Sequence, residues 1–145
     1  MTDPNGTSQI YRAARDSLIT HRDEYDAVAA NFRWPEVGSR FNWAIDWFDH
    51  VARGNSSTAL RIVGDDGSDE SYSFDEMATR SDRVAHWLAD GGVAPGDRVM
   101  LMLGNQVELW ESMLAVMKLG AVSLPATTAL GPKDLADRLS RGEVA

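Results

Sequence analysis

The chain contains no cysteine among its 145 residues. Disulfides, thiolate nucleophiles and cysteine-ligated metals are therefore excluded as features of this sequence. Long hydrophobic runs are also missing: the longest is Val99–Leu103, far shorter than the roughly 20 apolar residues that cross a bilayer. The N-terminal sequence MTDPNGTSQ has neither the basic region nor the apolar core of a secretory signal. These absences predict a cytoplasmic protein with no membrane span.

Positive charge is also scarce. Lys and Arg number 14 against 22 Asp and Glu, which gives a formal net charge of −8 and a pI near 4.7. An acidic protein repels the phosphates of nucleic acids and of anionic lipids, and no basic stripe reverses that repulsion here. We therefore expect no nucleic-acid partner. Hydrophobic residues at 43% and charged residues at 25% are typical of a soluble globular domain, and the length predicts one domain.

The N-terminal region is expected to hold a tail followed by one long helix. Residues 1–7 are polar and predict a disordered tail. Apolar residues then recur at helical spacing from Ser8 to about Phe32. Trp34-Pro35 should end this helix, because the residue before a proline is pushed out of the α conformation. The expected divisions are the disordered tail 1–7, the N-terminal helix segment 8–34, a linker-like stretch at 35–42, and an α/β subdomain over 35–145.

Caps and turns mark the elements that follow. Asn42 is placed to cap a helix, and Gly54 to terminate it at Arg53. Ser73 and Glu76 have the spacing of a capping box, in which each side chain bonds the other's backbone amide. The sequence thus predicts a helix at Asn42–Arg53, a β-hairpin with strands Ala59–Val63 and Glu70–Ser73, and a helix that starts after Ser73 and ends at Gly91-Gly92.

A parallel βαβ unit is predicted in the C-terminal part. Arg98–Leu103 is apolar without alternation, which is typical of a strand covered on both faces. We expect Arg98 to anchor the strand end by pairing with Asp97 or another acid. Asn105 should cap the next helix, 106–118, which leads to a second strand at Ala121–Pro125. A last helix should start at Gly131-Pro132 and run to about Ser140. The expected fold class is α/β, with a parallel βαβ sheet flanked by helices and preceded by amphipathic helices and a β-hairpin.

Several residues of types that often bind metals, cofactors or nucleic acids are interpreted here as structural. His21, His50 and His86 lie on three different expected helices, without a second ligand at metal spacing. The acidic group at Asp65, Asp66, Asp69 and Glu70 lacks the register of a calcium loop, so a solvated hairpin turn is favoured over a cation site. The five tryptophans and six methionines are interpreted as core. We expect no metal site and assign no catalytic residue.

The order of short motifs over Tyr72–Pro125 resembles the N-terminal part of the AMP-forming acyl-CoA synthetases, members of the adenylate-forming superfamily. Each motif is weak by itself, whereas the order and spacing over this span are specific. Two flanking motifs, Arg40–Ala44 and Pro125–Thr127, look most like the medium-chain branch. The motifs are Tyr72-Ser73-Phe74, Glu76-Met77, Arg83-Val84-Ala85, Gly92-Val93, Gly96-Asp97-Arg98-Val99, Asn105, Glu108, Lys118-Leu119-Gly120-Ala121-Val122 and Pro125.

The resemblance implies a two-step ligase reaction. A fatty or aromatic carboxylic acid attacks the α-phosphate of Mg²⁺·ATP, and the thiol of CoA then displaces AMP. In that family the phosphate loop, the adenine-binding aromatic, the ribose-binding Asp and the catalytic lysine lie downstream, and none has a counterpart in this sequence. We therefore expect the 145-residue chain to be the N-terminal region of such a ligase, to be inactive alone, and to bind none of ATP, Mg²⁺ and CoA by itself.

One binding segment is implied by the same resemblance. In related synthetases the loop after the second strand lines the tunnel for the pantetheine arm of CoA. The matching residues here are Thr127, Thr128, Ala129 and Leu130, and a plain strand-to-helix loop is the alternative interpretation.

The expected partners are the remainder of the synthetase chain and, because sheet neighbours are missing, a second copy joined through the exposed sheet face or edge. The alternative function is a truncated, non-catalytic paralogue that acts as a protein-interaction module.

Overall fold

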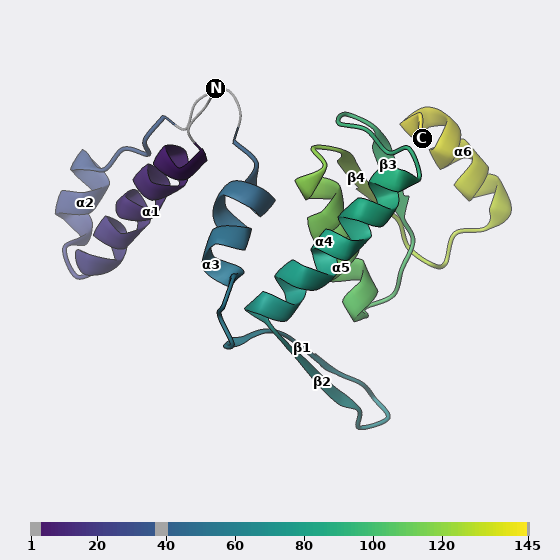
Figure 1. The fold of residues 1–145 in the computed structure, drawn as a ribbon, viewed down its shortest axis with the longest axis horizontal. Coiled ribbons are helices and arrows are strands. Elements are labelled where there is room, and N and C mark those ends of the chain that lie inside the picture. Colours follow the sequence, from purple (N-terminus) through teal and green to yellow (C-terminus); the bar gives the residue numbers. More distant parts are fainter. Residues whose placement is uncertain (1–3, 37–40, 145) are drawn as a thin grey trace. The chain divides into compact units, whose positions relative to one another are not determined.

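The computed structural model describes residues 4–36 and 41–144. Its internal contacts divide the chain into two units, residues 1–41 and 42–145. The boundary between the units lies between residues 41 and 42, closer to the C-terminus than the one expected between residues 34 and 35. Residues 37–40 of the expected linker lie outside the described part. Figure 1 follows the chain from α1 to α6. Helices and strands are mixed as the sequence predicted for an α/β fold.

The first unit contains two helices, α1 (Pro4–Thr20) and α2 (Tyr25–Asn31). The single helix expected from Ser8 to Phe32 is therefore wrong. Thr20 Oγ1 donates to the Asp16 carbonyl at 2.8 Å, and His21 Nδ1 lies 2.8 Å from the Ser17 carbonyl. These side chains occupy carbonyls of the last turn of α1, which favours a break over further helix. Residues 4–7 belong to α1, so the expected tail is wrong for them, and residues 1–3 lie outside the description.

The second unit begins with an under-wound helix. A π-helix, η1 (Trp43–Asp49), continues directly into the short α3 (His50–Ala52). Asn42 caps it as predicted: its side-chain oxygen accepts from the backbone amides of Ala44 and Ile45, at 3.0 and 3.2 Å. Gly54 follows with a φ of 72°, the left-handed conformation expected of a residue that terminates a helix. The π winding was not predicted.

A β-hairpin comes next, formed by β1 (Thr58–Val63) and β2 (Asp69–Ser73) in antiparallel register. Its turn is shaped by Asp66, whose Oδ1 accepts from the amide of Ser68 at 3.0 Å, and by Gly67 with a φ of 84°. The hydrogen bonds from Ser68 lower the pKa of the Asp66 carboxyl. The hairpin interpretation of this acidic stretch is confirmed.

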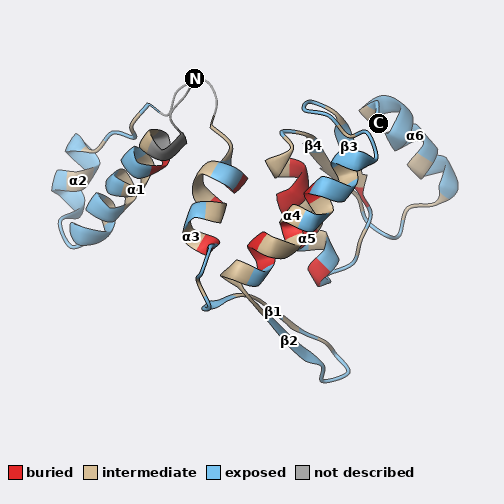
Figure 2. Ribbon diagram, in the orientation of Figure 1, coloured by how far each residue is buried: buried red, intermediate tan, exposed pale blue. Residues whose placement is uncertain are grey.

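Two long helices pack against each other to form the core of the second unit: α4 (Phe74–Asp90) and α5 (Val107–Lys118). Both hydrogen bonds of the capping box are present, between Ser73 and Glu76. Figure 2 shows the buried residues concentrated on these helices and on the segment around α3. The main buried cluster consists of Ala44, Phe48, Ala52, Met77, Ala78, Val107 and Leu114.

The parallel pair is confirmed: β3 (Arg98–Leu101) lies beside β4 (Val122–Pro125), and α6 (Pro132–Gly142) follows. Two details differ from expectation. The strand ends at Leu101 instead of Leu103, and Met102 is 38% exposed, because the described sheet has two strands and leaves apolar positions uncovered. Asn105 is not the cap of α5. Gln106 holds that position, and Asn105 Oδ1 instead accepts from Trp110 Nε1 at 3.2 Å.

None of the helices in the described part of the chain is both long and apolar enough to span a bilayer. His21, His50 and His86 are all exposed. Over residues 4–36 and 41–144, no three His, Asp or Glu side chains are grouped as metal ligands.

Candidate functional site

A cleft of about 660 Å³ lies beside β3, β4 and α6. Ligands of open α/β sheets bind outside the carboxyl ends of the strands, and the loop that leaves β4 there borders this cleft. Its floor is apolar, from Met100 and Leu124, whereas its wall on α6 is charged. The lining residues are Met100, Leu124, Pro125, Ala126, Leu130, Asp134, Asp137, Arg138, Arg141 and Gly142.

The segment Thr127–Leu130, which the sequence singled out, contributes one residue to the lining of this cleft. Leu130 lines the cleft and is half-buried, whereas Thr127, Thr128 and Ala129 are exposed. The hydroxyl oxygen of Thr127 accepts from the amide of Ala129 at 3.2 Å, which fixes the turn. The loop is therefore rigidified by its own hydrogen bonds and presents one apolar side chain inward.

The wall supplied by α6 carries both signs of charge. Proline at its first position fits the sequence expectation, and the carbonyl of Gly131 accepts from the Leu135 amide at 2.9 Å. Asp137 pairs with Arg141 one turn later. Arg98, on β3, pairs with Glu143 at 2.7 Å, which confirms the expected anchoring of the strand end by an acid. An apolar floor with a polar wall suits the binding of a flexible chain that carries polar groups.

A buried ionic cluster lies elsewhere in the second unit, and the sequence did not predict it. The ammonium of Lys118, on α5, is 2.6 Å from Asp82 Oδ1 on α4 and 2.7 Å from Asp49 Oδ1 on η1. The Lys118 side chain is 6% exposed, and Asp49 Oδ1 is itself buried, with the ionic contact to Lys118 as its neutralising partner. Arg53 bonds Asp82 from the outside at 2.5 Å. Burial alone would raise the pKa of Asp82, but the hydrogen bonds from Lys118 and Arg53 bring it below its ordinary value.

A second ion pair fixes α4 to α5. Arg80 Nε donates to Glu111 Oε2 at 2.6 Å, and the guanidinium lies 5.3 Å from the centroid of the Tyr72 ring. The Tyr72 hydroxyl donates to Glu70 at 2.6 Å, and this hydrogen bond raises the pKa of Tyr72. Neither the Arg80–Glu111 pair nor the cluster around Lys118 was foreseen, since the partners of Glu111 and of Lys118 are far from them in sequence. The one available signal was a charged residue on an otherwise apolar helix face, at Glu111 and Lys118.

Known proteins resemble this chain over most of its length. The family described as AMP-binding enzyme matches residues 47–145. The chain is 35% identical over 154 positions to the mitochondrial acyl-coenzyme A synthetase ACSM5 of Rattus norvegicus, an alignment that covers 93% of this chain and 27% of that protein. The chain thus spans about a quarter of the length of the curated relatives that it matches.

Solved structures agree with these relatives. The Brucella canis acyl-CoA synthetase superposes with a TM-score of 0.68 at 29% identity, over 89% of this chain and 23% of that chain. The Bacillus subtilis O-succinylbenzoate coenzyme A synthetase, solved with AMP, shares the fold at a TM-score of 0.59 and 24% identity, over 72% of this chain and 26% of that one. The expected resemblance to AMP-forming acyl-CoA synthetases, most like the medium-chain branch, is confirmed. Because the family match extends over more than half of its residues, this chain belongs to the AMP-binding enzyme family.

Proposed function

We propose that this chain is the N-terminal segment of an AMP-forming acid–CoA ligase. The ligase converts a carboxylic acid, ATP and CoA into acyl-CoA, AMP and pyrophosphate, with Mg²⁺ on the phosphates, and it acts on fatty or aromatic acids in the cytoplasm. The observation that carries the proposal is the parallel β3–α5–β4 unit with α6 behind it, in a chain whose likeness to the Brucella canis acyl-CoA synthetase covers 89% of its residues.

The role of the segment in that ligase is scaffold, with one contribution to binding. Leu130 lines the 660 Å³ cleft beside β4, and the turn at Thr127 connects it to Ala126, which also lines the cleft; this supports a place for the segment in the wall of the CoA tunnel. The pantetheine arm of CoA is a flexible chain with amide groups, and an apolar floor with a charged wall suits it. Thr128 and Ala129 complete the same turn and are proposed to limit the width of the tunnel.

A pair of variants in the full ligase tests this role. Leu130→Arg places a long cation in the cleft and should raise the KM for CoA at least tenfold, while the KM for ATP stays unchanged. Ala89→Arg, on the exposed side of α4, is the matched control for added charge. Equal effects on both substrates, or no effect of Leu130→Arg, would remove the loop from the CoA site and leave the family assignment intact.

The 145-residue chain alone is proposed to be catalytically inactive and to bind none of the three cofactors. The sequence carries no glycine-rich phosphate loop, and Gly64-Asp65-Asp66-Gly67 is acidic and repels phosphate. ATP–pyrophosphate exchange by the purified chain measures this directly. Exchange above the rate of a buffer blank would overturn the proposal.

Association is proposed through the uncovered parts of the two-stranded parallel sheet. Val122, on β4, is 45% exposed, and Met102, directly after the end of β3, is 38% exposed; both are apolar. Either the rest of the synthetase chain or a second copy would cover them. Light scattering of the isolated chain should report dimers or larger species. A monomer at millimolar concentration would contradict self-association.

A non-catalytic interaction module is the second candidate, favoured by a different set of exposed apolar side chains. Trp43, Ile45 and Trp110 are 45%, 47% and 42% exposed in the second unit. A partner that covered them would need no ligase chemistry. The sequence of the gene distinguishes the two candidate functions. A reading frame that continues past Ala145 into a glycine-rich loop ending in Pro-Lys supports the ligase.

A further inference from the structure

Both ends of the π-helix η1 are attached to the same residue, Lys118. At the start, the side-chain amide of Asn42 donates to the carbonyls of Met117 and Lys118, at 2.7 and 3.3 Å. At the end, Asp49 Oδ1 lies 2.7 Å from the Lys118 ammonium. The backbone of Lys118 thus holds one end of the segment and its side chain holds the other. We call the contacts among Asn42, Asp49, Asp82 and Lys118 the Lys118 clasp.

The clasp is nearly closed to water at its centre. The Lys118 side chain is 6% exposed, and its ammonium contacts Asp49, Asp82 and the Ala78 carbonyl, the last at 3.2 Å. Of its three N–H donors, two are accounted for by hydrogen bonds to Asp82 and the Ala78 carbonyl, and the contact with Asp49 Oδ1 is an ion pair. A buried ion pair of this kind is rigid, because separating it leaves an uncompensated charge in the interior. The positions of Asn42 and Asp49 are therefore fixed relative to each other.

The burial pattern of the segment fits an under-wound helix. The buried residues Ala44, Phe48 and Ala52 recur at intervals of four. In an α-helix of 3.6 residues per turn, each such step rotates about 40° away from the core. Wider turns, in which amides bond to carbonyls five residues back, rotate the same step in the opposite sense, so a π segment followed by the α-helical α3 keeps the three side chains near one line. The attachments at Asn42 and Asp49 and the spacing of the buried face therefore act in the same direction.

We propose that the Lys118 clasp is a conformational device that holds Trp43–Asp49 in its π-helical winding. Loss of the ammonium releases Asp49, and the end of the segment rewinds, with the amides of Trp47–Asp49 moving from the carbonyl five residues back to the carbonyl four residues back, the pattern that the Asp46 amide already has. Asn42 is the first residue of the second unit, so the device lies at the N-terminal edge of that unit. The device depends on no ligase chemistry, so it stands or falls independently of the proposed function.

Lys118→Met tests the device, because methionine keeps the apolar stem and the backbone carbonyl while removing the charge. Scalar couplings across hydrogen bonds, measured by NMR, identify the acceptor carbonyl of each amide in Trp47–Asp49, the part of η1 whose acceptors five residues back are Asn42–Ala44. We expect these acceptors five residues back in the unmodified chain and four residues back in the variant. Arg53→Met is the matched control: it removes a neighbouring cation but leaves the ammonium between both carboxylates, so the winding should persist.

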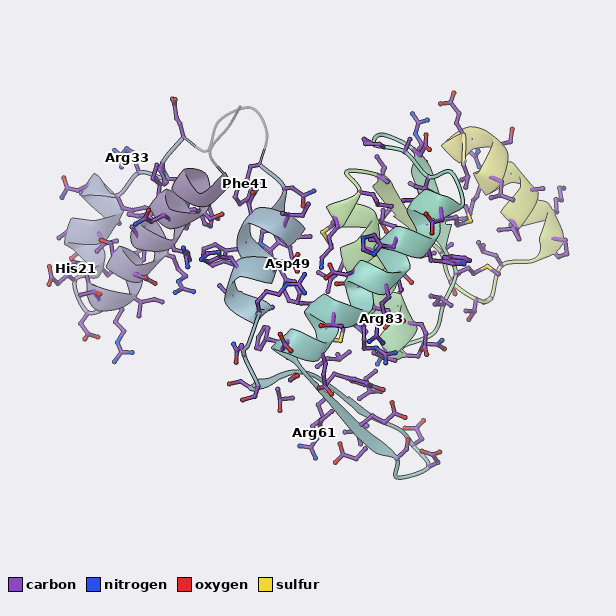
Figure 3. All side chains as sticks on the ribbon, viewed as in Figure 1. His21, Arg33, Phe41, Asp49, Arg61 and Arg83 are labelled. Carbon is purple, nitrogen blue, oxygen red and sulfur yellow. The ribbon has the colours of Figure 1, made fainter. Side chains whose placement is uncertain are left out.

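Two results would overturn the proposal. One is a folded Lys118→Met chain that retains acceptors five residues back, and the other is rewinding in Arg53→Met. Should Lys118→Met fail to fold, Asp49→Asn is measured in the same way, because its side chain has nearly the same shape and lacks the charge. Retention of the π winding in Asp49→Asn would equally contradict a clasp held by the ammonium. Figure 3 marks Asp49 on the segment concerned.

Discussion

Removing the guanidinium of Arg80 should destabilise the second unit more than removing the charge of its partner, Glu111. The two side chains meet at 2.6 Å, but their exposures differ: the Glu111 side chain is 10% exposed and that of Arg80 is 35% exposed. Arg80→Met leaves a carboxylate buried without its counter-ion. Glu111→Gln leaves a cation that already reaches water, and it keeps an acceptor oxygen in place. Because Glu111 is the more buried partner, Arg80→Met should lower the free energy of unfolding more than Glu111→Gln does.

The magnitudes follow from that geometry. Breaking a fully buried ion pair costs about 3–5 kcal/mol, and the partial exposure of Arg80 reduces this to about 2–3 kcal/mol for Arg80→Met. Loss of the contact with the Tyr72 ring adds about 0.5–1 kcal/mol. Glu111→Gln replaces a charged hydrogen bond by a neutral one, for about 1 kcal/mol. In the double variant the buried charge is gone, so the costs should fall short of additivity by about 1–2 kcal/mol.

Urea unfolding of the four proteins, followed by tryptophan fluorescence, measures these differences. With a slope of roughly 1.5–2 kcal/mol per M, the combined cost of Arg80→Met should lower the midpoint by about 1.3–2.7 M, and Glu111→Gln by about 0.5–0.7 M. Asp90→Asn, at the exposed end of α4, is a control for a change of one charge and should leave the midpoint within about 0.3 M. Equal midpoints for the two single variants, or strict additivity in the double variant, would refute the reasoning from burial.

Three further outcomes are expected. Ser73→Ala removes the hydroxyl that accepts from the Glu76 amide at 3.2 Å and should cost about 1 kcal/mol in the same urea assay, whereas Ser73→Asp should retain most of the stability. Gly92 has a φ of 99°, a conformation that strains any residue with a Cβ atom. Gly92→Ala should therefore lower the free energy of unfolding by about 1 kcal/mol or more, which a lower melting temperature would show. Asp82 has a pKa below its ordinary value, despite the raising effect of burial, because Lys118 and Arg53 bond its ionised form. Its stabilisation is therefore complete above the unfolded pKa of about 3.9 and is lost as the pH falls through the lower folded pKa. Unfolding measured from pH 6 to pH 2 should show this loss, and Asp82→Asn should show a smaller one.

The elements that sequence reasoning placed well are those whose cause is local. Ser73 and Glu76 are three residues apart, and the capping box they form depends on nothing else in the chain. Gly54 and Gly92 take positive φ because a helix has just ended, and the residues that end the helix are their immediate neighbours in sequence. Asn42 could be assigned as a cap for the same reason.

The errors arose where two local solutions competed. Asn105 and Gln106 both precede α5, and either could have occupied the cap position. The structure uses Asn105 to accept from the indole of Trp110, one turn into the helix, and this contact decides between them. In the first unit, the apolar spacing continues past Thr20, but α1 ends there, where side chains bond carbonyls of its last turn, and four residues separate it from α2. Periodicity reports the face of a helix and says little about a break within it.

The Lys118 cluster shows why charge clusters were invisible at the sequence level. Asp49, Asp82 and Lys118 are separated by 33 and 36 residues (82 − 49 and 118 − 82), and they come from three different helices. Their meeting requires that η1, α4 and α5 pack with one register, which is a property of the assembled core. Conversely, a lysine on the C-terminal turn of an otherwise apolar helix can be buried only beside carboxylates, because an unpaired ammonium in the interior costs several kcal/mol. A charged residue within an apolar stripe thus predicts that a partner exists, while the partner's identity has to come from the packing of the helices.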